Sequence, residues 1–151
     1  MLGEDGNDGL IGRSVCKMFE EKHAMEALSK NETQVSMSVE LLEVYNEKVR
    51  DLLSSEKDQD LKVNSSEVVG NIVVKTNTVD EVMKVLRLAQ SRRCVKATGS
   101  NAESSRSHMI FTIRYNVTMK DGVERNVKLN ICDLAGSERL DKSGANNVGV
   151  S

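Results

Sequence analysis

The chain has 151 residues, of which 38% are hydrophobic and 29% charged, as is ordinary for one globular domain. No apolar run approaches the roughly 20 residues that a membrane helix needs, and a net charge of -2 argues against a general nucleic-acid binder. We therefore expect no nucleic-acid and no membrane partner. The three cysteines are far apart and form no C-x-x-C pair, so a reducing cytoplasm is expected and a zinc site is not.

The first predicted element is a helix that follows a loop rich in Gly, Asp and Asn. Ser14 is expected to cap it, and it is expected to end near Asn31. Its apolar positions fall near one face: Val15, Met18, Phe19 and Met25.

Alternating apolar and polar residues over 35–45 predict a strand that enters a core. Residues 46–53 are interpreted as a short helical turn that folds back on this strand. A polar linker follows at 54–60. Two β-prone runs, 61–63 and 68–75, surround a Gly70-Asn71 turn signal and predict a small hairpin or a loop excursion.

A second helix is predicted after Thr78, because Glu81 three residues later completes a capping box. One face of this helix is apolar: Val79, Val82, Met83, Leu86 and Ala89. Four cations gather toward its end, and we interpret them mainly as a solvated basic terminus that complements the helix dipole: Arg87, Arg92, Arg93 and Lys96.

The most regular alternation in the chain runs from Met109 to Met119 and predicts a half-buried strand. Asp121-Gly122 is a turn signal, and a second strand resumes at Val127 and ends at Asp133. The sequence therefore predicts a β-hairpin that places an acid at the end of a strand.

Two short segments carry groups suited to phosphate chemistry. Asp133-Leu134-Ala135-Gly136 puts a carboxylate at a strand end, where it can order the water around magnesium, and a glycine whose amide can approach a phosphate. Residues 101–108 contain several hydroxyls and the guanidinium of Arg106. Taken alone, the first segment also fits a simple strand and turn, and the second a capping loop or linker.

Taken together, these segments resemble the kinesin family. Residues 101–108 are similar to its switch I signature, N-x-x-S-S-R-S-H, and residues 133–139, D-L-A-G-S-E-R, to its switch II signature. The segments 43–53 and 9–14 also resemble kinesin motor heads, in the same order. The resemblance implies an α/β fold, a partial kinesin-type P-loop NTPase with a mixed central sheet flanked by helices, in which residues 1–151 are part of the motor domain.

The resemblance implies a pocket for ATP and Mg²⁺. Ser105 would contact magnesium and the terminal phosphate, Ser104 would line the same pocket, and Asp133 would hold the metal through water. The Gly136 amide would sense the terminal phosphate, and Asn101 would support the loop.

The resemblance also implies the catalytic groups, which are Ser105, Arg106 and Glu138. Arg106 would pair with Glu138 when the switches close, and Glu138 would help to relay a proton from the attacking water. Ser107 and His108 are expected only to lead into the strand that follows.

The sequence contains no G-x-x-x-x-G-K-[S/T] phosphate loop. The nearest approach runs from Gly136 to Ser143 and has Asp141 where the second glycine belongs, so an acid would repel the phosphates. We therefore predict that the 151-residue chain alone has negligible affinity for ATP. The strand that would carry this loop normally lies beside the strand ending at Asp133, so the outer edge of that strand is expected to be bare and prone to self-association.

Three functions fit the sequence. The preferred one is a fragment of an ATP-dependent microtubule motor head, located in the cytoplasm on the microtubule cytoskeleton. The second is a non-catalytic module that binds tubulin or a second motor subunit through the loop at 54–78. The third is a GTPase, which fits D-x-x-G but lacks an N-K-x-D motif for recognising the base.

Overall fold

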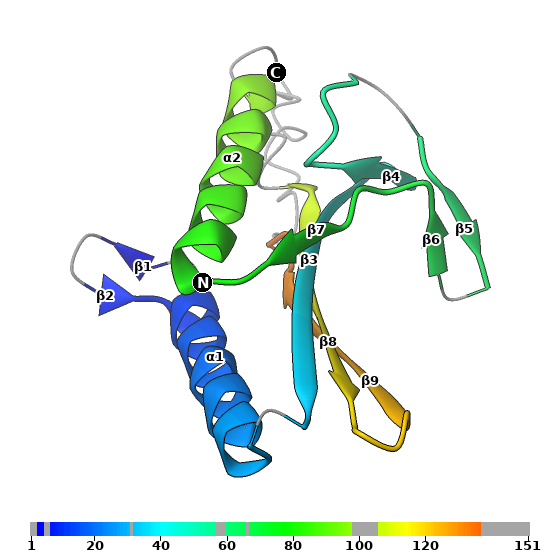
Figure 1. Ribbon diagram of the computed structural model, residues 1–151. Helices are drawn as coiled ribbons and strands as arrows, with labels where there is room; N and C mark the ends of the chain where they lie inside the picture. Colours follow the sequence, from blue (N-terminus) through cyan, green and yellow to red (C-terminus); the bar gives the residue numbers. More distant parts are fainter. Residues whose placement is uncertain are drawn as a thin grey trace, which may run out of the picture.

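The computed structural model describes residues 3–4, 7–30, 32–56, 60–65, 67–97 and 106–136. In chain order (Figure 1), its helices and strands are β1 Gly3–Glu4, β2 Asn7–Asp8, α1 Leu10–Leu28, β3 Gln34–Tyr45, β4 Lys48–Asp51, β5 Lys62–Asn64, β6 Glu67–Val69, β7 Val74–Thr76, α2 Val79–Ala97, β8 His108–Thr118 and β9 Glu124–Asp133.

A central sheet organises the described part of the chain. Its strand order is β4-β3-β8-β9, with β7 also pairing with β3, and each of these pairings is antiparallel. β3 pairs with β8 from Gln34 opposite Thr118 to Val44 opposite His108. The predicted central sheet with flanking helices is confirmed, and so is the predicted hairpin of β8 and β9.

The core lies between one face of the sheet and the two helices, which Figure 1 shows on the same side of β3. Strand side chains alternate between faces, so the odd-numbered residues of β3 and β8 point to the helices. Those with almost no exposure include Val39, Leu41, Met109, Phe111 and Ile113. α2 adds Val82, Leu86 and Ala89, all fully buried, as its apolar periodicity predicts. Neither described helix has an apolar stretch sufficient to cross a bilayer.

The start of α2 confirms the predicted capping box. The backbone N–H of Glu81 donates to Thr78 Oγ1 at 3.2 Å. The Glu81 carboxylate reaches back and accepts from the N–H of Asn77 at 2.7 Å. The first bond satisfies a backbone donor that the helix start leaves unpaired. The second reaches one residue beyond the N-cap and holds Asn77 against the first turn.

The predicted start and end of α1 are wrong. The helix begins at Leu10 with Gly9 as its N-cap, not at Ser14. The extra turn is stabilised by packing, because Ile11 is fully buried in the core one turn before Val15. The helix ends at Leu28, where Ser29 donates its N–H to the Met25 carbonyl at 3.1 Å.

The helical turn predicted at 46–53 is also wrong, because Lys48–Asp51 forms β4. Asn46 and Glu47 both have positive φ, 49° and 62°, as a two-residue hairpin between twisted strands requires. The Asp51 carboxylate then accepts from the N–H of Leu53 at 2.7 Å and of Ile72 at 2.6 Å. It thereby ties the end of β4 to the chain that follows the next hairpin.

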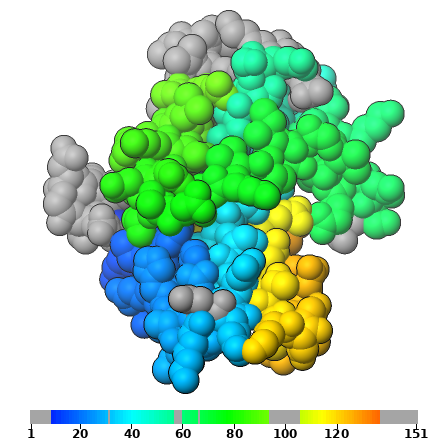
Figure 2. Space-filling model, in the orientation of Figure 1, coloured from blue at the N-terminus to red at the C-terminus, as the bar shows by residue number. Residues whose placement is uncertain are grey.

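The small hairpin predicted after the polar linker is present as β5 and β6, but its turn lies between Asn64 and Glu67. Gly70, with φ of 90°, serves instead at the exit, where the chain leaves the hairpin for β7. In Figure 2 the green segment with this hairpin lies beside the yellow and orange β8–β9 hairpin.

Candidate functional site

The structure describes three of the residues that the sequence nominates for the site: Arg106, Asp133 and Gly136. Asn101, Ser104, Ser105 and Glu138 lie outside the described residues. The expected pairing of Arg106 with Glu138 therefore remains a prediction. The structure nevertheless describes the end of the first signature, residues 106–108, and the start of the second, residues 133–136.

Arg93, on α2, joins these two ends. Its guanidinium lies 3.4 Å from the Asp133 carboxylate and 3.6 Å from the carboxylate of Glu43 on β3. Its Nη2 also donates to the Ser107 carbonyl at 2.9 Å and to Ser107 Oγ at 3.2 Å. We call Glu43, Arg93, Ser107 and Asp133 the Arg93 cluster. It fixes the start of β8 and the end of β9 to one helix.

Ser107 and His108 do more than lead into β8, so this expectation is wrong. Ser107 is fully buried beside Arg93. The backbone N–H of Ala135 donates to His108 Nδ1 at 3.0 Å, so this ring nitrogen carries no proton. This bond joins His108, the last residue of the signature at 101–108, to Ala135 within the signature at 133–139.

The described groups have a charge pattern suited to a cation. In the Arg93 cluster one guanidinium lies between two carboxylates. The Glu43 side chain is 6% exposed, whereas that of Asp133 is 41% exposed. Gly136, three residues further on, is also exposed. A half-exposed carboxylate at a strand end fits a contact with hydrated magnesium, although the described residues contain no group of three ligands that could hold a metal directly.

The interpretation of Arg92 and Arg93 as a solvated helix end is wrong. Arg92 Nη1 donates to the carbonyls of Leu52 at 3.1 Å and Ser54 at 2.9 Å. Arg93 is only 15% exposed. One signal in the sequence could have revealed its role: Glu43 falls on the buried face of β3, where a carboxylate needs a cationic partner.

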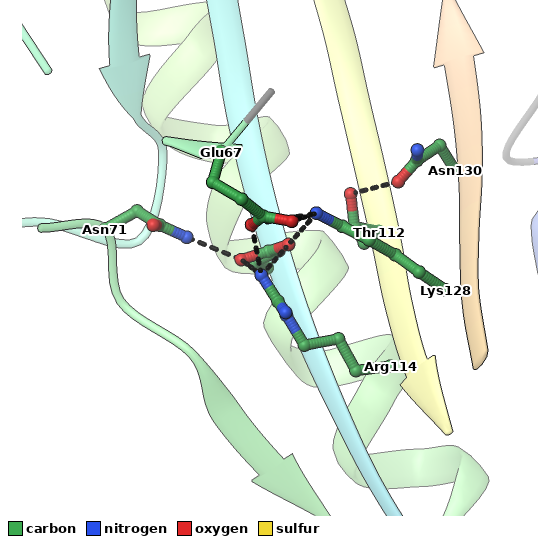
Figure 3. Close-up of polar contacts among 7 residues, drawn as sticks. Glu67, Asn71, Thr112, Arg114, Lys128 and Asn130 are labelled. Atoms are coloured by element: carbon green, nitrogen blue, oxygen red, sulfur yellow. Dashed lines mark hydrogen bonds and ion pairs between the residues drawn. The ribbon is translucent and has the colours of Figure 1, made fainter. Parts of the chain in front are cut away.

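A second polar cluster lies on the opposite face of the sheet, where Figure 3 labels Glu67, Asn71, Arg114 and Lys128. Together with Glu40, which contacts both Asn71 and Arg114, we call these residues the Arg114 cluster. Arg114 Nη2 lies 3.1 Å from Glu40 and 3.3 Å from Glu67. Lys128 Nζ lies 3.2 Å from Glu67. Asn71 donates its amide to Glu40 at 2.6 Å. Glu67 thus connects the β5–β6 hairpin to β8 and β9.

The Arg114 cluster is internally balanced, with two acids facing two cations. The hydrogen bond from Lys128, with a smaller contribution from Arg114, lowers the pKa of Glu67. A cavity of about 140 Å³ adjoins the cluster, and the same paired charges line it. Among the described residues, the Nε of Arg114 is buried without a hydrogen-bond partner, but the charged groups of the cluster pair with one another, so we interpret the cluster as structural.

The fold and the two signatures define an α/β domain in which a hydroxyl-rich loop ends beside the D-L-A-G turn. The chain belongs to the kinesin motor-domain family. Residues 1–150 match the family model described as "Kinesin motor domain".

The chain is similar to several kinesins. It is 37% identical over 157 residues to mouse Kinesin-like protein KIF13A, covering 96% of this chain and 9% of that protein. It is 38% identical over 151 residues to rice Kinesin-like protein KIN-14N, covering 91% of this chain and 19% of that protein. The chain therefore spans less than a quarter of the length of these relatives.

Solved structures show the same fold. A fast kinesin matches with a TM-score of 0.83 and 32% identity, over 96% of this chain and 41% of that one. The motor and motor homology domain of Kar3Vik1 matches with a TM-score of 0.76 and 26% identity, over 94% and 37%. The expected partial kinesin fold is confirmed.

Proposed function

We propose that this chain is part of the head of an ATP-dependent microtubule motor, acting in the cytoplasm on the microtubule cytoskeleton. Family membership supports this proposal. The observation that carries it is the junction of Arg93, Ser107 and Asp133, because a motor must couple the two loops that face its nucleotide. The bond from Ala135 to His108 adds a second link between the same loops.

Each proposed role follows from what the residue can donate or accept. Asp133 would hold magnesium through water, Ser105 would contact the metal and the terminal phosphate, Ser104 would line the same pocket, and Asn101 would support the loop. The Gly136 amide faces the terminal phosphate. Bound ATP supplies the phosphoryl group that is transferred to water, and magnesium offsets its charge.

The remaining proposed roles position these groups. Arg93 holds the Asp133 carboxylate at the strand end from 3.4 Å away. Arg106 would pair with Glu138 when the switches close, and Glu138 would help to relay a proton from the attacking water. His108 fixes the amide of Ala135, next to Gly136.

The 151-residue chain alone is proposed to bind ATP negligibly. Its sequence has no G-x-x-x-x-G-K-[S/T] loop to surround the phosphates. Each missing charge-assisted contact is worth about 1.5–3 kcal/mol, and such a loop makes several. Titration of the chain with a fluorescent ATP analogue and Mg²⁺ should give no saturable signal, and saturable magnesium-dependent binding would contradict this.

The motor proposal is tested on the gene that encodes the chain. We expect the reading frame to include a phosphate loop upstream, and the protein made from it to hydrolyse ATP faster with microtubules. Asp133→Asn should abolish this activity, and Glu67→Gln, in the internally balanced cluster, serves as the matched control. A full reading frame without a phosphate loop, or activity that survives Asp133→Asn, would contradict the proposal.

A second candidate is a non-catalytic module that binds tubulin or a second motor subunit through residues 54–78. One observation favours it: this segment exposes Val63 and Val69, each 56%, and Val73, 45%. The similar Kar3Vik1 structure includes a motor and a motor homology domain. Co-sedimentation with microtubules without nucleotide, lost in Val63→Ser/Val69→Ser but kept in Leu88→Ser, would support this function over the first.

A further inference from the structure

Arg92 and Arg93 are neighbours on α2, but their guanidinium groups reach different parts of the molecule. Consecutive residues of an α-helix point about 100° apart around its axis. Arg93 holds the described ends of the two signatures, as shown above. Arg92 instead donates from Nη1 to the carbonyls of Leu52, at 3.1 Å, and Ser54, at 2.9 Å. One turn of α2 therefore contacts both the candidate site and the start of the segment at 54–78.

The stretch that Arg92 contacts follows β4 directly and is tied to the β5–β6 hairpin. Figure 1 shows the end of α2 beside this stretch. The buried Asp51 carboxylate, at the end of β4, accepts from the N–H of Leu53 at 2.7 Å and of Ile72 at 2.6 Å. Ile72 lies where the chain leaves the hairpin for β7. A displacement of the stretch after β4 therefore reaches the base of the hairpin through Asp51.

The contact of Arg92 is suited to fixing a position. Leu52 is buried and Ser54 is half-buried, and backbone carbonyls that are removed from water need a donor. The N–H groups of a guanidinium lie in one rigid plane. Because a single Nη1 bonds two carbonyls that are two residues apart, it constrains the backbone between them as well as the distance to α2.

The place of the two arginines near the end of α2 lets one respond to the other. The helix ends at Ala97, about one turn beyond Arg93. Helix ends fray readily, so the direction of this part of α2 depends on the contacts of its side chains. Arg92 and Arg93 share a peptide unit, which means that a shift of Arg93 toward or away from Asp133 moves the backbone that carries Arg92.

We propose that Arg92 is a positioning residue that couples the candidate nucleotide site to the segment at 54–78. A change at Asp133 passes through Arg93 and the end of α2 to Arg92, and from there to the stretch after β4. Coupling between two binding sites is reciprocal, so a partner bound to 54–78 changes the affinity of the site for nucleotide. The part of this inference that concerns nucleotide rests on the proposed function, whereas the coupling within the chain does not.

A double-mutant cycle in the 151-residue chain tests the coupling without nucleotide. Asp133→Asn weakens the ion pair with Arg93. Hydrogen exchange of the Leu53 and Ile72 amides should then accelerate about threefold relative to the amides of β8, which report global opening. In an Arg92→Ala background, Asp133→Asn should cause no further acceleration at these two amides. If Arg92 only stabilised the fold, the two substitutions would have independent and additive effects.

Two further variants of α2 are controls for this cycle. Arg87→Ala removes an exposed arginine of the same helix and should leave the response to Asp133→Asn intact. Arg92→Lys keeps a cationic donor near the two carbonyls and should retain most of the response that Arg92→Ala loses. Circular dichroism of each variant checks that it is folded.

The protein made from the complete reading frame tests the link to nucleotide. Hydrogen exchange is compared with and without magnesium and a non-hydrolysable ATP analogue. Binding should change the exchange of the Leu53 and Ile72 amides at least about fivefold, the low end of typical coupling. The change should occur in the unaltered protein and in Arg87→Ala but not in Arg92→Ala. Failure of the unaltered protein to bind the analogue would contradict the motor proposal alone, because the cycle in the 151-residue chain decides the role of Arg92 independently.

Three results would overturn the proposal for Arg92. The first is an Asp133→Asn substitution that leaves the exchange of the Leu53 and Ile72 amides unchanged in the otherwise unaltered chain. The second is an acceleration by Asp133→Asn that is equally large in the Arg92→Ala background. The third is a complete protein in which the bound analogue changes the exchange of these two amides equally with and without Arg92→Ala.

Discussion

Two arginines hold the sheet from opposite faces, and their surroundings differ. Arg93 lies on the helix side between Glu43 and Asp133, and its side chain is 15% exposed. Arg114 lies on the other side between Glu40 and Glu67, and its side chain is 33% exposed. Each therefore connects a buried acid of β3 to a more exposed acid elsewhere in the chain.

The difference lies in the balance of charge. The Arg114 cluster has Lys128 as a second cation, and Asn71 also donates to Glu40. Among the described residues, the Arg93 cluster has two carboxylates around one guanidinium. A balanced cluster serves the fold, whereas an excess of negative charge at a half-exposed strand end fits the binding of a cation. The comparison therefore separates a structural cluster from a candidate site.

The largest effect is expected from Arg93→Ala. Removing the guanidinium leaves the carboxylate of Glu43, which is 6% exposed, without this cation. Breaking a buried ion pair by removing one partner costs about 3 kcal/mol or more, and urea denaturation measures this loss of unfolding free energy. Adding Glu43→Gln should restore part of this unfolding free energy. A double variant as unstable as Arg93→Ala would contradict the assignment of the loss to the unpaired carboxylate of Glu43.

A smaller loss is expected from Arg114→Ala. Glu40 would keep the amide of Asn71 at 2.6 Å and Lys128 at 3.9 Å, so its charge stays partly compensated. We expect a loss of about 1–2 kcal/mol in the same urea experiment. If Arg114→Ala lowers the unfolding free energy as much as Arg93→Ala does, the extra donors to Glu40 do not compensate its charge, and the proposed difference between the two clusters is wrong.

A local effect is expected at His108. His108→Ala removes the acceptor for the Ala135 N–H, and one such bond is worth about 1 kcal/mol, or roughly a fivefold change in an opening equilibrium. Hydrogen exchange of the Ala135 amide, followed by NMR, should accelerate by about that factor. His108→Asn offers an oxygen near the same position and should restore most of the protection, whereas equal exchange in both variants would contradict the role of the ring nitrogen.

The smallest effect is expected at Glu67, which is exposed. Because its folded pKa is lowered, chiefly by the hydrogen bond from Lys128, its ion pairs contribute fully above the ordinary glutamate value of 4.5. That contribution is lost as pH falls through the lower folded pKa. Protection of the β5–β6 amides, corrected for intrinsic exchange, should therefore decrease in acid and in high salt.

Glu67→Gln is the control for this measurement. At neutral pH it should already show the reduced protection of β5 and β6, with little further change in acid. The overall urea midpoint should move little. If the exchange protection of the β5–β6 amides changes neither with pH nor in Glu67→Gln, the ion pairs of Glu67 do not stabilise this hairpin.

Local patterns in the sequence predicted the parts of the fold that depend on neighbouring residues. The alternation through Phe111 and Ile113 identified the buried face of β8, and Thr78 with Glu81 located the start of α2. The acid at the end of β9 was predicted from the strand and turn around Asp133. Each of these features is determined within about ten residues of chain.

Other features depend on distant parts of the chain and could not be found in this way. Arg93 contacts Glu43, which lies 50 residues earlier in the chain, and Asp133, which lies 40 residues later. No local periodicity in the sequence can reveal contacts at such separations. The β3–β4 turn was missed because Asn46-Glu47 lacks the glycine that usually marks such turns. Packing of Ile11 against the core, rather than a capping side chain, determined the start of α1.

The acids that anchor the two arginine clusters, Glu40 and Glu43, are three positions apart on β3. Because strand side chains alternate, an odd separation sends one carboxylate to each side. Inserting or deleting a single residue between them would put both on the same side, so one arginine would lose its partner whichever alignment the strand adopted. The spacing of these two acids therefore makes this stretch of β3 intolerant of a change in length.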